Sequence, residues 1–131
     1  MDSSSIQLPG SQIDQVTFAD GELRIGFPRA YLIKTMTGSA ERTRWWQAGE
    51  LVLTGVELEA PLPAGAAIVD GGDIEQNVYV YRDMIPVPLD GGGHCRCDLR
   101  LRDSDQRITA HGRTIRMELR DLPKYVEHLR D

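Results

Sequence analysis

The chain of 131 residues is long enough for one domain with a hydrophobic core, and no apolar run approaches the length of a transmembrane helix. Its net charge of −5 makes it a poor candidate for general nucleic-acid binding, which depends on neutralising phosphates. Met1–Gly10 lacks the apolar stretch of a signal peptide, so we expect a cytoplasmic protein whose two cysteines are reduced.

The start of the chain contains one weak and one strong pattern. Residues 1–11 are polar and predict a frayed tail, which leaves residues 12–131 as a single β domain. Within Val16–Ile25, Asp20-Gly21 stands between two alternating runs and predicts a two-residue hairpin turn. The large apolar residues of both runs then share one face of the hairpin.

The next stretch contains two apolar runs and one ambiguous segment. Pro28 is expected to end the first hairpin, and Ala30–Met36, apolar on both faces, predicts a buried strand. Thr37–Gly49 fits either a short helix that begins at Ser39 or a loop that leads into a strand. Leu51–Leu58 predicts a strand whose apolar residues change phase in the middle, as a β-bulge would cause.

Glycine and proline punctuate the middle of the chain. Ile68–Tyr81 predicts a hairpin that turns at Gly71-Gly72. Ile85–Leu89 contains two prolines, which cannot donate to a ladder, so it predicts an edge strand or a strap. Asp90–Gly93 predicts a flexible loop.

The last third of the chain alternates most regularly. Cys95–Arg102 has its cysteines and leucines on one face and its charges on the other, and Arg107–His111 and Thr114–Arg120 repeat the alternation. The apolar spacing then changes to i, i+3, i+4, i+7 and predicts an amphipathic helix of about two turns on Leu122, Tyr125, Val126 and Leu129.

These elements predict a mostly β fold: an antiparallel β-sandwich or barrel of about eight to ten short strands with a short C-terminal helix. An open sheet leaves unpaired backbone groups at its rims. Ala30–Met36 and the Trp45-Trp46 pair also supply more apolar surface than one face needs. We therefore expect a homodimer with Trp45 and Trp46 as candidate interface residues, the alternative being that both pack within the chain.

The segment His94-Cys95-Arg96-Cys97 holds the types of ligand that zinc favours. A structural zinc site needs four ligands, however, and the two cysteines share one face of the predicted strand. We interpret Cys95 and Cys97 as buried core residues and expect no metal and no cofactor.

A stripe of arginines is the candidate for anion binding, on Arg100, Arg102, Arg107 and Arg116. If the hairpin turns at Ser104-Asp105, Arg102 faces Arg107, and an anion bound between facing arginines would relieve their repulsion. The alternative is a solvated face that neighbouring acidic residues balance.

The sequence contains no visible catalytic set. Neither serine nor cysteine is placed beside a histidine so as to form a nucleophilic pair, and His111 is expected to pair with Asp98. Whether the chain is an enzyme stays open, with the absence of a motif weighing against it.

Met84–Asp90, the alternating hairpin after it and Tyr125–Glu127 cover about a third of the chain. In these segments the chain resembles a group of small bacterial all-β domains without an assigned activity. The resemblance implies a single bacterial cytosolic domain.

Two functions are compatible with these patterns. The first is a non-catalytic binding or interaction domain that self-associates. The alternative is a small-ligand-binding or enzymatic β-barrel with its site in the barrel mouth. A deep pocket with converging polar groups would favour the second, and a flat apolar patch the first.

Overall fold

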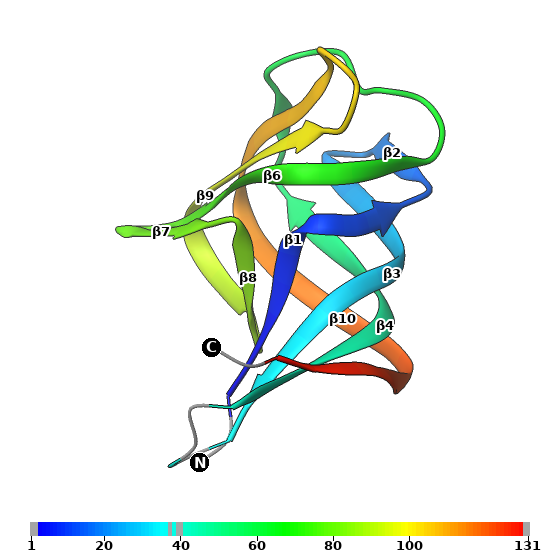
Figure 1. Ribbon diagram of the computed structural model, residues 1–131. Helices are drawn as coiled ribbons and strands as arrows, with labels where there is room; N and C mark the ends of the chain where they lie inside the picture. The colour runs from blue at the N-terminus through cyan, green and yellow to red at the C-terminus, as the bar shows by residue number, and fades with distance from the viewer. Residues whose placement is uncertain (1–2, 37, 39–40, 130–131) are drawn as a thin grey trace.

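The computed structural model describes residues 3–36, 38 and 41–129, which form ten strands (Figure 1). The strands are β1 (Ser3–Ile13), β2 (Val16–Ala19), β3 (Glu22–Thr35), β4 (Arg42–Thr54), β5 (Glu57–Leu58), β6 (Ala67–Gln76), β7 (Tyr79–Arg82), β8 (Met84–Val87), β9 (Asp90–Leu101) and β10 (Arg107–Leu129). Among these residues no helix is long and apolar enough to span a bilayer.

Six strands are paired in a closed ring. Their order is β1–β3–β4–β10–β9–β6, and β6 pairs again with β1. The other four strands extend this ring, with β2 on β3, β5 on β10, β7 on β6 and β8 on β1. Every pairing is antiparallel, and the buried side chains form one hydrophobic core. The prediction of a mostly β, antiparallel fold is confirmed.

The hairpin predicted over Val16–Ile25 is confirmed residue for residue. Val16 faces Ile25 and Phe18 faces Leu23. Asp20 and Gly21 have φ values of 52° and 75°, the left-handed pair that a type I′ turn requires. This turn chemistry explains why so short a segment fixed its own register.

The alternation of β9 and β10 is also confirmed, but the register between them differs from the prediction. Cys95, Cys97, Leu99 and Leu101 are all buried. Arg107 faces Arg100 rather than Arg102. The turn is longer than predicted because Asp103 is left-handed and the Ser104 hydroxyl accepts a hydrogen bond from the Gln106 amide, which keeps Arg102 outside the ladder.

The predicted C-terminal helix is wrong. Its residues continue β10, where Tyr125 pairs with Trp45 and His128 with Thr43 of β4. Register shifts after Arg120 and after Tyr125 break the two-residue period of the strand. Bulges of this kind turned a strand pattern into one with helical spacing on Leu122, Tyr125, Val126 and Leu129.

The predicted frayed tail is wrong for residues 3–11, whereas Met1 and Asp2 lie outside the described residues. Residues 3–11 belong to β1, which pairs with both β3 and β8. Ile6 and Leu8 are fully buried in the core. These two apolar residues are enough to hold a polar segment in the sheet, because the strands on both sides of β1 supply the rest of the packing.

Three segments that were predicted as a turn, a loop or a strand end, from their glycine or proline residues, lie within strands. Gly71-Gly72 lies inside β6, where a Cβ on Gly72 would be 2.2 Å from the Asp98 carbonyl oxygen, and Asp90–Gly93 belongs to β9. Pro28 does not end β3. The glycines therefore permit close strand approach rather than a turn.

The strand assignments also decide the predictions for Ile85–Leu89 and Thr37–Gly49. Ile85–Leu89 contributes to β8, which pairs with β1 at the end of the strand path and is thus an edge strand, as predicted. Within Thr37–Gly49 the alternative of a strand holds from Arg42 onward. Ser39 lies outside the described residues.

Candidate ligand groove

The arginines predicted to bind an anion are each paired with a carboxylate. Arg107 donates hydrogen bonds to Asp98 at 2.9 and 3.0 Å. The other pairs are Arg100 with Asp83 at 3.5 Å, Arg102 with Asp70 at 3.8 Å, and Arg116 with Glu118 at 2.8 Å. Arg116 lies beside Asp90, at the opposite end of β9 from Arg100, so these four arginines do not form one cluster. Their contacts fit the alternative of a charge-balanced face.

The two tryptophans make ring contacts within the chain. Trp46 stacks on Tyr31 with ring centres 3.8 Å apart. Trp45 packs against the core and meets the edge of Tyr125 at 5.4 Å. Both are half-buried, and their role in a subunit interface stays a prediction.

The cysteines are buried and free, as predicted. Burial raises the pKa of both thiols, that of Cys97 to about 12, so neither forms a thiolate at neutral pH. The described residues hold no cluster of three or more side chains that could ligate a metal. These findings disfavour a role for either cysteine as a nucleophile.

The prediction that His111 pairs with Asp98 is wrong. In the shifted register His111 faces Arg96, and its ring lies 3.3 Å from Glu57 and 3.4 Å from Glu59. Arg96 donates to both carboxylate oxygens of Glu59, which lowers the pKa of that carboxyl. His111 and Arg96 of this hairpin are thus paired with carboxylates in and directly after β5.

Two interruptions of the ladder lie on opposite sides of β4. On one side the register between β3 and β4 shifts within Phe27–Ala30. On the other side the register between β10 and β4 shifts within Arg120–Lys124, where Asp121 has a left-handed φ of 62°. Since a bulge redirects side chains away from the ladder, residues from β3 and β10 converge over the small side chain of Ala48.

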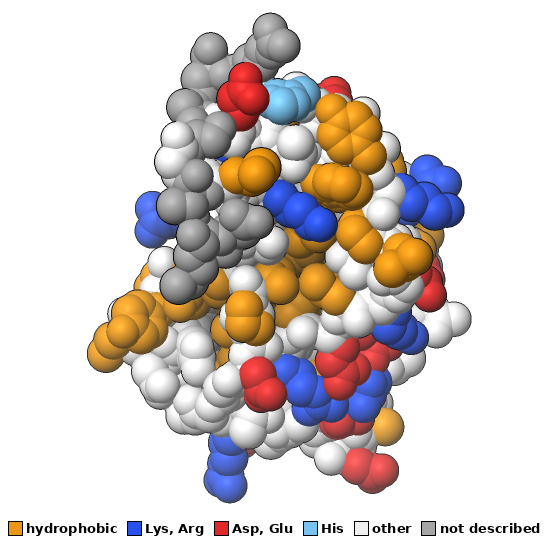
Figure 2. Space-filling model, turned by 90° about the horizontal axis from the view of Figure 1, so that it is seen from below, with side chains coloured by type: hydrophobic (Ala, Val, Ile, Leu, Met, Phe, Trp, Pro, Cys, Tyr) orange, Lys and Arg blue, Asp and Glu red, His pale blue; other side chains and the backbone are white. Residues whose placement is uncertain are grey.

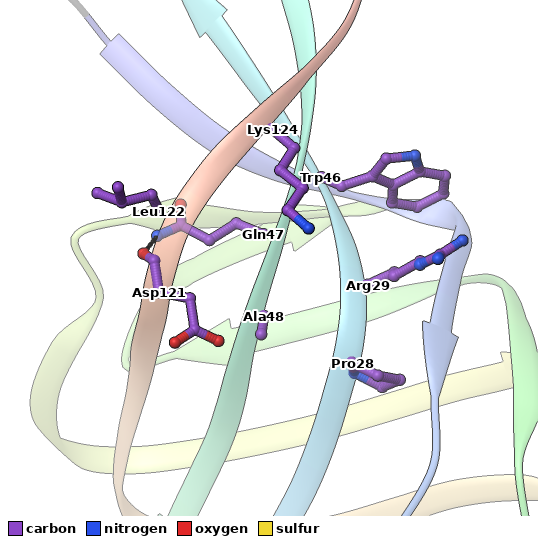
Figure 3. A pocket seen from close by; sticks show the side chains of 8 residues that line it. All are labelled: Pro28, Arg29, Trp46, Gln47, Ala48, Asp121, Leu122 and Lys124. Carbon is purple, nitrogen blue, oxygen red and sulfur yellow. Dashed lines mark hydrogen bonds between the residues drawn. The ribbon is translucent and has the colours of Figure 1, made fainter.

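A groove lies over these two bulges. One pocket of about 360 Å³ is lined by Pro28, Arg29, Trp46, Gln47, Ala48, Asp121, Leu122 and Lys124 (Figure 3). A second pocket of about 470 Å³ is lined by three of the same residues together with Asp14, Gln15, Gly26, Phe27, Gly49, Glu50 and Arg120. The shared residues are Pro28, Ala48 and Asp121, so the two pockets form one groove across β3, β4 and β10.

The groove has two ends of opposite charge. Arg29 and Lys124 line the first pocket, and the Arg29 guanidinium lies 5.9 Å from the centre of the Trp46 ring. Asp14 lines the second pocket, and Asp121 lines both. Within residues 3–36, 38 and 41–129 none of these four charges takes part in an ion pair, in contrast to the arginines of β9. Glu50 and Arg120 also line the second pocket and pair with each other at 3.3 Å, so they leave its acidic character to Asp14 and Asp121.

One glutamine fixes the shape of the groove. The Gln47 amide donates a hydrogen bond of 3.0 Å to the Asp121 carbonyl oxygen, across the β10 bulge (Figure 3). In that view Lys124 and Trp46 lie on one side of Ala48, whereas Asp121 lies on the other. The lining residues include no cysteine, histidine or serine, so the groove is equipped to bind charged groups rather than to supply these common nucleophiles.

The end of the ring near the chain termini has a different character. Figure 2 shows that face, where hydrophobic side chains gather around a hollow. Charged side chains also lie on this face (Figure 2). The groove is the better match for a polar ligand, because charged side chains line its pockets.

Sequence reasoning missed every charged residue of the groove. Arg29 and Lys124 are far apart in the chain and converge only because β3 and β10 both pair with β4. One signal could have found them, since Pro28 and Pro123 both interrupt strand patterns and proline within a sheet is confined to edges and bulges.

Comparison with models of protein families, with curated proteins and with solved structures finds no match to this chain. The resemblance to small bacterial all-β domains therefore stays a prediction.

Proposed function

We propose that this chain is a non-catalytic binding domain, built on a closed barrel, whose groove over β3, β4 and β10 holds an anionic ligand. The observation that carries the proposal is the pair of cations Arg29 and Lys124, which lack a carboxylate partner among the described residues and line a pocket with Trp46. Two cations and an indole that line one pocket offer charge and apolar contact to a carboxylate or phosphate compound. A cytoplasmic location and a bacterial origin remain predictions.

A titration with inorganic phosphate, followed by amide NMR signals, tests this proposal. We expect saturable shifts at millimolar phosphate that disappear in the double variant Arg29→Gln, Lys124→Gln. The matched control is Arg102→Gln, Arg107→Gln, which removes two exposed arginines from the hairpin. Loss of binding in the control, with retention in the groove variant, would contradict the proposal and favour the arginine stripe.

A second candidate function, self-association, is favoured by the β6–β7 hairpin. Its tip residues Val78, Tyr79 and Val80 are 87, 61 and 54 % exposed, and the hairpin projects from the body of the molecule (Figure 1). β7 pairs with β6, and no other strand of the described residues pairs with it. An exposed apolar edge is a template for pairing with a second chain.

Sedimentation at micromolar concentration tests self-association. We expect a dimer of the 14.6 kDa chain that Val80→Lys converts to a monomer, because a charge on the edge opposes strand pairing. Met36→Lys, which changes another exposed apolar residue, should leave the dimer intact. A monomeric unmodified protein would contradict this candidate, and a dimer that survives Trp46→Ala would remove Trp46 from the interface.

A further inference from the structure

We propose that the ligand of the groove is an extended peptide segment with a negative group near one end and a positive group about four residues away. This inference rests on the proposed function and specifies the class of ligand. It starts from the two ends of the groove, which carry opposite charges.

The cationic end can hold a carboxylate. Arg29 and Lys124 approach it from the β3 bulge and the β10 bulge, and both side chains are exposed to solvent. Trp46 lines the same pocket and is itself held by stacking on Tyr31. A carboxylate there would gain two charge-assisted contacts without displacing an existing ion pair.

The acidic end can hold an ammonium or guanidinium group. Asp14 lies where β1 ends, and its amide donates to the Gly26 carbonyl oxygen at 3.0 Å. One oxygen of the Asp14 carboxylate accepts a hydrogen bond from the next amide, Gln15, at 2.6 Å, which fixes the side chain. A Cβ on Gly26 would lie 2.6 Å from that same oxygen, so a larger residue there would displace the Asp14 carboxylate. The other oxygen has no described partner.

The distance between the two ends defines the length of the ligand. Lys124 pairs with Trp46 of β4, and Gly26, which binds Asp14, pairs with Glu50. The span from Trp46 to Glu50 is four residues of one strand, roughly 13 Å at 3.3 Å per residue. An extended peptide of five residues covers the same length between its first and last side chains, and these two side chains lie on the same face.

The acidic residues also argue against a polyanion. Asp14, Asp121 and Glu50 line the same groove as the cations, and the chain carries a net charge of −5. A nucleic-acid backbone would bring a phosphate against these carboxylates at one end of the groove. A ligand that bears both signs of charge satisfies both ends.

Amide NMR titrations with four blocked pentapeptides test this inference on the full chain. The dipolar probes are acetyl-Glu-Gly-Gly-Gly-Lys-amide and acetyl-Lys-Gly-Gly-Gly-Glu-amide, because the direction of the bound chain is undetermined. The uniformly charged probes are acetyl-Glu-Gly-Gly-Gly-Glu-amide and acetyl-Lys-Gly-Gly-Gly-Lys-amide. One dipolar peptide should bind about fivefold tighter than either uniformly charged peptide, the effect expected of one additional exposed ion pair.

Two isosteric substitutions sharpen the test. Asp14→Asn keeps the acceptor oxygen for Gln15, and Asp121→Asn suits the left-handed φ of 62° at that position. The double variant should bind the dipolar and the diacidic peptide equally, and should bind phosphate at least as well as the unmodified protein. Equal binding of the dipolar and diacidic peptides by the unmodified protein would overturn this inference and leave the anion site standing. If neither phosphate nor any peptide shifts the groove signals, both proposals fail.

Discussion

Between β9 and β10 the register is unbroken from Arg107 to Gly112, and Arg96, Arg100 and Arg107 each meet a carboxylate. Across β4 the register breaks on both sides, and four charged side chains reach the surface without an ion-pair partner among the described residues. In a regular ladder, neighbouring side chains are held at fixed spacing and neutralise one another. Where bulges interrupt the ladder, charged side chains point away from their cross-strand neighbours, and they become available to a ligand.

The largest expected contrast between the two regions concerns stability. Leu99 is fully buried in the regular hairpin, so Leu99→Ala should lower the free energy of unfolding by about 2–5 kcal/mol. Leu122 lines the groove and is 84 % exposed, so Leu122→Ala should change it by less than about 0.5 kcal/mol. Urea unfolding of both variants measures the difference, and similar losses at the two positions would remove the distinction.

The second expected effect is a pH dependence of stability that arises from a buried cysteine of the hairpin. Burial raises the pKa of Cys97 to about 12 from an ordinary value near 9. The folded state therefore holds this proton more tightly, and stability should be constant below about pH 9 and fall towards pH 12 by up to about 1.4 kcal/mol per pH unit.

Unfolding curves of Cys97→Ala isolate that contribution from the other groups that titrate in this range. The variant should show a shallower decline between pH 9 and 12 than the unmodified protein. An identical decline would mean that the Cys97 thiol ionises freely in the folded state.

A smaller effect is expected from the ion pair that joins the hairpin to the segment after β5. Hydrogen bonds from Arg96 lower the pKa of Glu59, so its contribution to stability is present above the unfolded pKa and is lost as the pH falls through the folded value. Because both side chains are partly exposed, Glu59→Gln should cost about 0.2–1 kcal/mol at pH 7. Equal stabilities of the two proteins in urea at pH 7 would refute this role.

The smallest stability effect is expected in the groove itself. Arg29→Gln together with Lys124→Gln removes no ion pair among the described residues, so the free energy of unfolding should change by less than about 0.5 kcal/mol. Thermal melting checks this expectation. A loss above about 1 kcal/mol would mean that these cations stabilise the fold and are not free for a ligand.

The parts of the fold that could be predicted from sequence are those whose signal is local. Asp20-Gly21 specified its hairpin because turn chemistry and apolar alternation agreed, and the alternation of Cys95–Leu101 identified its buried face. The C-terminal segment misled because two bulges in β10 shift the phase of a strand and imitate helical spacing. Periodicity cannot separate these cases without knowledge of the partner strand.

The groove could not be predicted for a related reason. Asp14, Arg29 and Lys124 belong to three segments that meet only through β4, and none of them stands in a recognisable motif. The arginine stripe, in contrast, was conspicuous in the sequence because its residues are close together. A two-residue change of register then placed Arg107 against Asp98, and carboxylates outside that pairing neutralise Arg100, Arg102 and Arg116.

The most direct test of the contrast between these two surfaces is the location of the amide signals that inorganic phosphate shifts in the unmodified protein. We predict saturable shifts at residues 29, 46–48, 121, 122 and 124, with the signals of residues 100–107 unchanged. Shifts centred on residues 100–107, with the groove signals unchanged, would contradict the assignment of ligand binding to the bulged strands.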